Sequence, residues 1–219
     1  MSREFFREYY ESSHAPLALS FFRGFKKYLR NHIVEEVAGE AADFDVFSEF
    51  WYETAEELMK TGEFLESDKA PVIRHDENQF MTQQRIVSFA VEEYLIAGEE
   101  RCIESQVEKL VIAMKRSSAV SAEAFSQQLL TVAGSLAESW RPLRLTCSIV
   151  QHNEEEGAWD AFMFVWPGAR NTKFELPAEL SELFSSAGGR HLVVRTLSFE
   201  TDLKSVYQNT PAAEGATSE

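Results

Sequence analysis

Three consecutive residues with acid–base or metal-binding side chains, His75, Asp76 and Glu77, form the most chemically suggestive cluster in the sequence. Imidazole and carboxylate groups bind divalent metals, and a bound metal activates water for hydrolysis. The polar pattern of residues 66–78 predicts a loop around them. These residues are therefore candidate catalytic residues of a metal-assisted hydrolase, with a solvated polar loop as the alternative, because consecutive side chains point in different directions.

The two cysteines, Cys102 and Cys147, show neither the spacing of a zinc module nor a disulfide framework. Cys147 and His152 would make a nucleophilic pair if they met, but residues five apart on a strand lie on opposite faces. We therefore predict that Cys147 is a core residue. The common phosphate, dinucleotide, zinc-protease and nucleophile-elbow motifs are absent from the sequence, so we expect no cofactor and no dedicated metal.

Four basic residues lie close together near the start of the chain, against its overall negative charge. Such a group can bind an anionic surface or an acidic partner helix, and it can also be neutralised internally by the acidic segment that follows it. We favour internal neutralisation and keep the group as a candidate partner-binding site. Its members are Arg23, Lys26, Lys27 and Arg30.

Aromatic residues are also concentrated at the N-terminus. They exceed what one helix stripe can bury, and exposed large rings commonly anchor protein interfaces. The candidate partner-binding aromatics are Phe5, Phe6, Tyr9 and Tyr10.

The elements that must position these residues are predicted from the spacing of apolar side chains. Three- and four-residue spacing predicts helices over residues 16–37, 43–65, 80–116 and 121–140. After Pro142 the spacing alternates, which predicts a hairpin, a short helix over residues 177–186 and a last strand over residues 191–201.

The fold class we expect is therefore α+β, with about four N-terminal helices packed against a small C-terminal β-β-α-β sheet. The helical portion spans residues 1–142 and the sheet portion residues 143–208, as one continuous core. Residues 209–219 are small and polar, which predicts a disordered tail.

Composition restricts the partners. The 219 residues include 36 acidic and 21 basic ones, a net charge of -15, which disfavours general nucleic-acid binding. The longest uncharged run, residues 124–137, is shorter than the roughly 20 apolar residues of a membrane span. We expect no membrane span and a cytoplasmic location, with the nucleus as the alternative.

Two short segments resemble parts of one known family. Residues 194–206, VRTLSFETDLKSV, resemble the closing strand of HORMA domains, and residues 107–114, VEKLVIAM, resemble their central strand. HORMA proteins bind partner peptides with a C-terminal segment that wraps around them, so the resemblance implies a peptide-binding domain. The chain departs from the family because only residues 115–120 separate the second segment from the next predicted helix.

The sequence as a whole favours a non-catalytic function in protein–protein interaction, as an adaptor, an assembly factor or a subunit of a complex. Binding would use the aromatic N-terminal helices or an edge of the sheet. The metal-assisted hydrolase is the alternative from a different class, and the HORMA-like peptide binder is a second alternative. A small apolar ligand held between helices and sheet is a further possibility.

Overall fold

Seven strands form one antiparallel sheet in the computed structural model, in the order β2-β1-β7-β4-β6-β5-β3. The structure describes residues 1–22, 24–68, 70–82, 86–99, 105–151, 159–168, 175–185 and 188–209. The strands are β1 (Phe25–Gly39), β2 (Val46–Tyr52), β3 (Ala90–Ala97), β4 (Ser105–Lys115), β5 (Arg144–Gln151), β6 (Ala161–Trp166) and β7 (Arg190–Glu200). The sheet is curled, and its two edge strands are β2 and β3.

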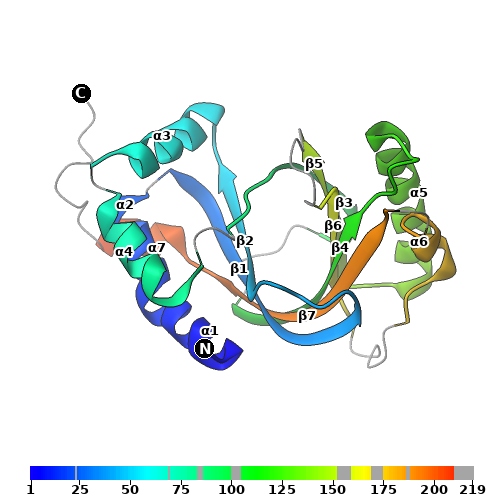
Figure 1. Cartoon of the computed structure of the whole chain (residues 1–219), viewed down its shortest axis with the longest axis horizontal. Helices are drawn as coiled ribbons and strands as arrows, with labels where there is room; N and C mark the ends of the chain where they lie inside the picture. The colour runs from blue at the N-terminus through cyan, green and yellow to red at the C-terminus, as the bar shows by residue number, and fades with distance from the viewer. Residues whose placement is uncertain are drawn as a thin grey trace.

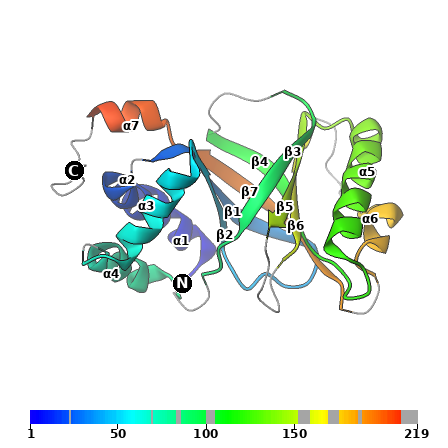
Figure 2. The same ribbon diagram turned by 90° about the horizontal axis from the view of Figure 1, so that it is seen from above.

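Helices gather in two groups outside the curled sheet (Figures 1 and 2). One group lies beyond β1 and β2: α1 (Arg3–Tyr9), the π-helical turn η1 (Tyr10–His14), α2 (Ala15–Phe21), α3 (Ala55–Glu66), α4 (Pro71–Phe80) and α7 (Leu203–Asn209). The other comprises α5 (Ala122–Trp140) and α6 (Ala178–Glu182). The ends follow local rules, since the Ser121 and Thr54 side chains accept backbone N–H bonds at the starts of α5 and α3.

The connectivity of residues 105–200 is β4-α5-β5-β6-α6-β7, and these strands lie in the order β7-β4-β6-β5. This βαββαβ unit with antiparallel neighbours is a ferredoxin-like arrangement. The remaining strands extend it at both sides: β1 pairs with β7, and β3 pairs with β5. The sheet is thereby widened enough to curl around a concave face.

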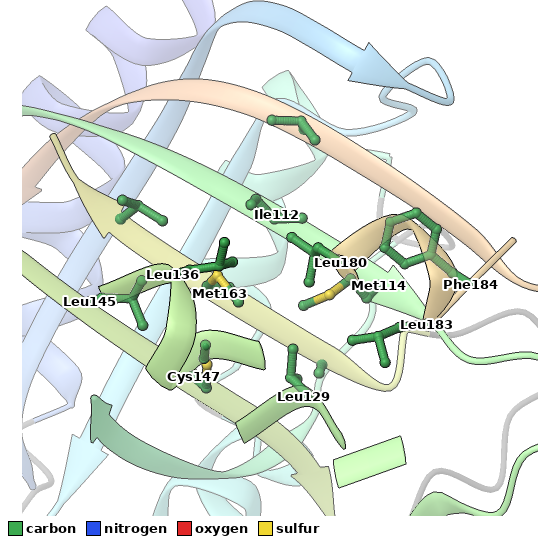
Figure 3. Packing of buried hydrophobic residues seen from close by; sticks show 14 of the residues in the cluster. Ile112, Met114, Leu129, Leu136, Leu145, Cys147, Met163, Leu180, Leu183 and Phe184 are labelled. Carbon is green, nitrogen blue, oxygen red and sulfur yellow. The ribbon is translucent and has the colours of Figure 1, made fainter. Parts of the chain in front are cut away.

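The larger part of the core lies between the convex face and α5 with α6, as Figure 3 shows. Alternate residues of β4 point into it, as do Leu129 and Leu136 of α5 and Leu180 of α6. Leu129 and Leu180 have no exposed surface. Burying side chains of this size stabilises the fold by roughly 1.5–3 kcal/mol each, which holds α5 and α6 against the sheet.

A second set of buried side chains covers the concave face. It includes Val111 and Ala113 of β4, which alternate with the residues that face α5, and Phe162 and Phe164 of β6. A third set packs α1, η1 and α2 against Tyr28 and its neighbours on the convex side of β1. The central strands are therefore buried on both faces.

The predicted helical N-terminal portion is wrong. Strands β1, β2, β3 and β4 lie within residues 1–142, where we expected helices over residues 16–37, 43–65 and 80–116. The physical reason is two-sided burial: consecutive residues of β1, from Tyr28 to Ile33, are all buried, so their spacing does not alternate. Gly39 ends β1, at a φ of 88°, and does not end a helix.

The elements after residue 121 are better predicted. Helix α5, the hairpin of β5 and β6, the short helix α6 and the last strand β7 all occur where the sequence places them. They belong to the same sheet as β1–β4, so the predicted small four-element sheet is only part of the observed one. Residues 210–219, most of the predicted tail, lie outside the described residues.

Candidate functional site

Polar and charged side chains interrupt the apolar concave face near its middle. The register places Asn31 of β1 opposite Ser198 of β7, and Lys109 of β4 opposite Thr196 of β7. Glu49 of β2 reaches the same place through its bond to Asn31. On the other side of the curl, Arg144 and Thr146 of β5 and Glu93 of β3 face the same interior. We call this set the concave polar cluster: Asn31, Glu49, Glu93, Lys109, Arg144, Thr146 and Ser198.

A chain of hydrogen bonds holds the carboxylate of Glu49. Ser198 Oγ donates to Asn31 Oδ1 at 2.6 Å, which fixes the orientation of the Asn31 amide. Asn31 Nδ2 then donates to Glu49 Oε1 at 2.6 Å and to the Phe47 carbonyl at 3.1 Å. One oxygen of Glu49 is therefore occupied by a donor of fixed direction.

The pKa of Glu49 is raised to about 7, chiefly because protein atoms exclude water from its carboxylate. The negative charge of Glu93 raises this pKa further, whereas Lys109, the Asn31 hydrogen bond and Lys27 lower it. The side chain is still partly exposed. Glu49 is thus a carboxyl group that exchanges protons with its surroundings near neutral pH.

Two cations lie against the ring of Trp166. Lys109 Nζ is 4.3 Å from the ring centroid, and the guanidinium carbon of Arg144 is 4.9 Å from it. Lys109 has no exposed surface and Arg144 only 5%. An Arg144 nitrogen lies 3.8 Å from a Glu93 oxygen, an ion pair too long for a good hydrogen bond. Buried cations beside a carboxyl group can stabilise negative charge that develops on a bound molecule.

A second polar network lies on the convex side, between η1 and β1. Glu11 accepts two hydrogen bonds from Arg30, at 2.6 and 3.1 Å, and one contact from His32 at 2.7 Å. Arg30 also donates to Thr201 at 2.6 Å. π-Helical turns are uncommon and often occur at functional positions. Here the turn directs Glu11 toward the sheet, and the network fastens the N-terminal helices to β1.

The residues His75, Asp76 and Glu77 lie on helix α4, where we expected a loop. Asp76 is buried: it accepts a hydrogen bond from Tyr9 at 2.7 Å and contacts His14 Nδ1 at 2.7 Å. His75 is exposed on another side of the helix. Among the described residues, no three His, Cys, Asp or Glu side chains are arranged to hold a metal ion.

Cys147 is fully buried on the convex side, and burial raises the pKa of its thiol to about 12. It lies in the core beneath α5, as Figure 3 shows. A thiol of this kind is a poor nucleophile at neutral pH. Cys102 and His152 lie outside the described residues.

The basic residues predicted to bind a partner have internal contacts. Arg30 pairs with Glu11 inside the convex network. Lys26 pairs with Glu53 at 3.2 Å across the exposed β1–β2 hairpin, and Lys27 lies 4.0 Å from Glu200 and over the Trp51 ring. Arg23 lies outside the described residues.

The N-terminal aromatics are mostly committed to the fold. Phe6 and Tyr10 are buried, with 7% and 4% of their surface exposed, and Tyr9 donates to Asp76. Phe5 is 54% exposed. The two segments that resemble HORMA strands lie mainly in β4 and β7, which are neighbours, and residues 194–206 end inside α7. The peptide-binding interpretation stays a prediction.

Sequence reasoning missed the concave polar cluster. Lys109 interrupts the apolar segment VEKLVIAM, and Arg144 starts the alternating segment RLTCSIV. A charged residue at an inward-facing position of a strand can indicate a functional site, but that position can be recognised only once the strand itself is assigned. Because we expected a helix over residues 80–116, the inward strand positions of Lys109 and Glu93 were not recognised.

The family model described as the EthD domain matches residues 1–84. The match covers the N-terminal helices, β1, β2, α3 and α4, which is less than half of the chain. EthD domains have a ferredoxin-like α+β fold, and the complete ferredoxin-like connectivity lies here in residues 105–200, beyond the match. A search of curated proteins found no match to this chain. Among the described helices, none is both long and apolar enough to cross a bilayer.

The convex network should make the protein lose stability at acidic pH. Burial alone would raise the pKa of Glu11, but the bonds from His32 and Arg30 outweigh it and hold the pKa below its usual value. This contribution is complete above about pH 4.5 and is lost as the pH falls through the lowered pKa. We expect Glu11→Gln to reduce the free energy of unfolding by about 3 kcal/mol at pH 7, and by much less at pH 3.

Urea unfolding at both pH values measures this difference. The control is Glu56→Gln, which removes an exposed ion pair with Lys60 and should change stability by less than about 0.5 kcal/mol. An equal loss for Glu11→Gln at both pH values would contradict the electrostatic role assigned to Glu11.

Glu49 should have the opposite effect from Glu11 on how the stability of the protein changes with pH. Because its folded-state pKa is raised, ionisation favours the unfolded chain, and the protein loses stability as the pH rises from about 4.5 to about 7. Glu49→Gln should therefore raise the free energy of unfolding at pH 8 by about 2 kcal/mol, allowing for partial exposure, and change it little at pH 4. Urea unfolding of the wild type, Glu49→Gln and the exposed Glu53→Gln tests this expectation. A gain that does not depend on pH would refute it.

Proposed function

We propose that this chain is an enzyme that transfers protons on a small organic substrate bound at the concave polar cluster, with Glu49 as the general acid–base. The observation that carries the proposal is the hydrogen-bonded chain Ser198–Asn31–Glu49, which ends in a carboxyl group that shares the concave face with two buried cations. Burying polar groups of this kind on an apolar face costs free energy.

The carboxyl group of Glu49 suits this role in position and in chemistry. A general acid–base works best when its pKa lies near the working pH, because both protonation states are then available. The fixed amide of Asn31 holds one oxygen, which leaves the other to face a bound molecule. Glu49 can accordingly take a proton from a substrate and return it within one catalytic cycle.

Lys109 and Arg144 suit the complementary role. When a base removes a proton from carbon next to a carbonyl group, negative charge develops on the carbonyl oxygen. Buried cations of fixed position stabilise such charge more strongly than water does. Lys109 is close enough to Glu49 to affect its pKa. The reaction class we propose is therefore proton abstraction next to a carbonyl, as in isomerisation, cyclisation or elimination.

Exposed apolar side chains lie on the same face as the cluster. Val91 and Leu95 of β3 face the concave side in register with Val150 and Thr146, and each is 45% exposed. Apolar side chains that remain exposed beside a polar cluster are typical of binding sites for organic molecules.

Deuterium exchange tests this proposal. We expect the wild-type chain, incubated in D2O with a metabolite extract of its source cells, to introduce deuterium into at least one small carbonyl compound detected by mass spectrometry. Glu49→Gln should slow this labelling at least 100-fold. Glu53→Gln, an exposed residue just after β2, should stay within twofold of the wild type. Labelling that survives Glu49→Gln, or no labelling by the wild type, would contradict the proposal.

A protein–protein interaction function is the second candidate, and exposed apolar side chains favour it. Phe5 of α1 is 54% exposed, and Leu58 and Met59 of α3 are 49% and 60% exposed. Helix α3 has no buried residue, although it packs Phe64 against Phe21 and Phe22. A partner subunit that covers these side chains would explain their exposure.

Native mass spectrometry of the affinity-purified protein tests this second candidate. We expect Phe5→Ser to reduce the amount of a stoichiometric partner at least tenfold while the melting temperature stays within about 2 °C. The matched control is Val72→Ser, which alters an equally exposed apolar residue on α4. A complex that is unchanged by Phe5→Ser would count against the N-terminal surface.

A further inference from the structure

Two buried polar atoms on β5 have no hydrogen-bond partner within the part of the chain that the structure describes: Arg144 Nε and Thr146 Oγ1. Arg144 is 5% exposed and Thr146 has no exposed surface. The two residues occupy successive inward positions of the strand, in register with Trp166 and Phe164, so both side chains belong to the concave face. They are neighbours within the concave polar cluster.

Leaving such atoms unpaired is costly. A buried donor without an acceptor costs about 1–3 kcal/mol, and native proteins leave few such atoms unpaired. Arg144 Nε is a donor only, and Thr146 Oγ1 carries a hydroxyl proton, so both atoms can bind the same kind of partner. An oxygen acceptor that none of the described residues supplies would satisfy both atoms.

The surrounding charges favour an acceptor that is negatively charged. Arg144 and Lys109 lie on the Trp166 ring, and the nearest ion-pair partner of Arg144, an oxygen of Glu93, is 3.8 Å away. A guanidinium group forms its strongest hydrogen bonds with carboxylates, frequently through two parallel N–H bonds. At that distance Glu93 does not make the close paired hydrogen bonds that Arg144 can form with a carboxylate, and no other described residue forms an ion pair with Arg144.

The neighbouring apolar side chains indicate that the rest of such a molecule is apolar. Leu95 pairs with Thr146 across β3 and β5 and is 45% exposed, and Val91 of the same strand is equally exposed. A carboxylate bound at Arg144 and Thr146 would place an attached apolar group near these side chains. Contact with them would remove apolar surface from water.

We propose that Arg144 and Thr146 bind the carboxylate of a small, largely apolar organic acid on the concave face. This inference deepens the proposed function and rests on it for what happens to the acid after binding, since the bound molecule lies within the same cluster as Glu49. Arg144 and Thr146 are then binding residues, and Glu49 is the catalytic residue.

Benzoate and benzamide form a matched pair of probes, because they share a ring and a shape and differ in the charge of the polar group. Isothermal titration calorimetry of the wild-type chain at pH 7 should give a benzoate Kd at least tenfold lower than the benzamide Kd. Arg144→Gln should weaken benzoate at least tenfold and leave benzamide within threefold. Thr146→Val keeps the shape of the side chain, removes its hydroxyl, and should weaken benzoate three- to tenfold.

The control is Arg190→Gln, an arginine on the Trp159 ring that pairs with Glu40 and should leave benzoate binding unchanged. Thermal unfolding checks that each variant is folded, and Thr146→Val tests the inference by itself if Arg144→Gln does not fold. Equal affinities for the two probes, no benzoate binding at millimolar concentration, or unchanged benzoate affinity in Arg144→Gln would overturn the inference.

The same set of variants separates this inference from the proposed function. Glu49→Gln removes a negative charge from the cluster and should bind benzoate as well as the wild type or more tightly, while it loses deuterium exchange. If Glu49→Gln abolishes exchange and Arg144→Gln still binds benzoate normally, only the carboxylate inference fails. If benzoate binding follows Arg144 and exchange survives Glu49→Gln, only the proposed function fails.

Discussion

Burial of the central strands on both faces is the constraint on which the rest of the structure depends. In β4, the five residues from Leu110 to Met114 have at most 5% of their surface exposed, and they alternate between the convex and the concave core. A strand of this kind needs cover on both sides. On the convex side helices supply it, with α5 and α6 over one end and the N-terminal helices over the other (Figure 2). On the concave side, side chains of the curled sheet itself supply much of it.

The concave polar cluster puts polar and charged side chains on a face that is otherwise apolar, which is why we place the proposed function there. Buried ion pairs gain little stability over well-packed apolar residues of similar volume. The fold has no evident need for Lys109 beneath Trp166, or for a hydrogen-bonded chain from Ser198 to Glu49 across three strands. The convex network of Glu11, Arg30 and His32 differs, because it joins η1 to β1 and the Glu11 carboxylate is held by both Arg30 and His32.

The difference between the predicted and observed folds has the same physical origin. Helix α5 has one buried face, and β5, although buried on both faces, alternates polar with apolar residues, so both show clean periodicity and were predicted correctly. The strands β1 and β4 are buried on two faces, so their sequences do not alternate. In β4 the apolar residues run consecutively, and in β1 the buried polar residues 30–32 leave the apolar ones at helix-like spacing. We expected the acidic segment that follows the basic group to neutralise it, whereas the partner of Arg30 is Glu11, which lies 19 residues earlier in the chain and reaches it only through the tertiary fold. A search for neighbouring residues in the sequence, which found His75 to Glu77, could not find a cluster assembled from six strands.

The most direct test of the central claim is a carbon-13 NMR titration of the Glu49 carboxyl group. This group lies in the concave face, where Asn31 holds it by a hydrogen bond, and burial and the charge of Glu93 raise its pKa to about 7. Its carboxyl resonance should therefore titrate with a midpoint near pH 7, and the midpoint should move to higher pH in Lys109→Met, which removes an attracting charge. A midpoint near 4.5, unchanged in Lys109→Met, would mean that Glu49 is an ordinary solvated carboxylate and would contradict the assignment of the concave polar cluster as the functional site.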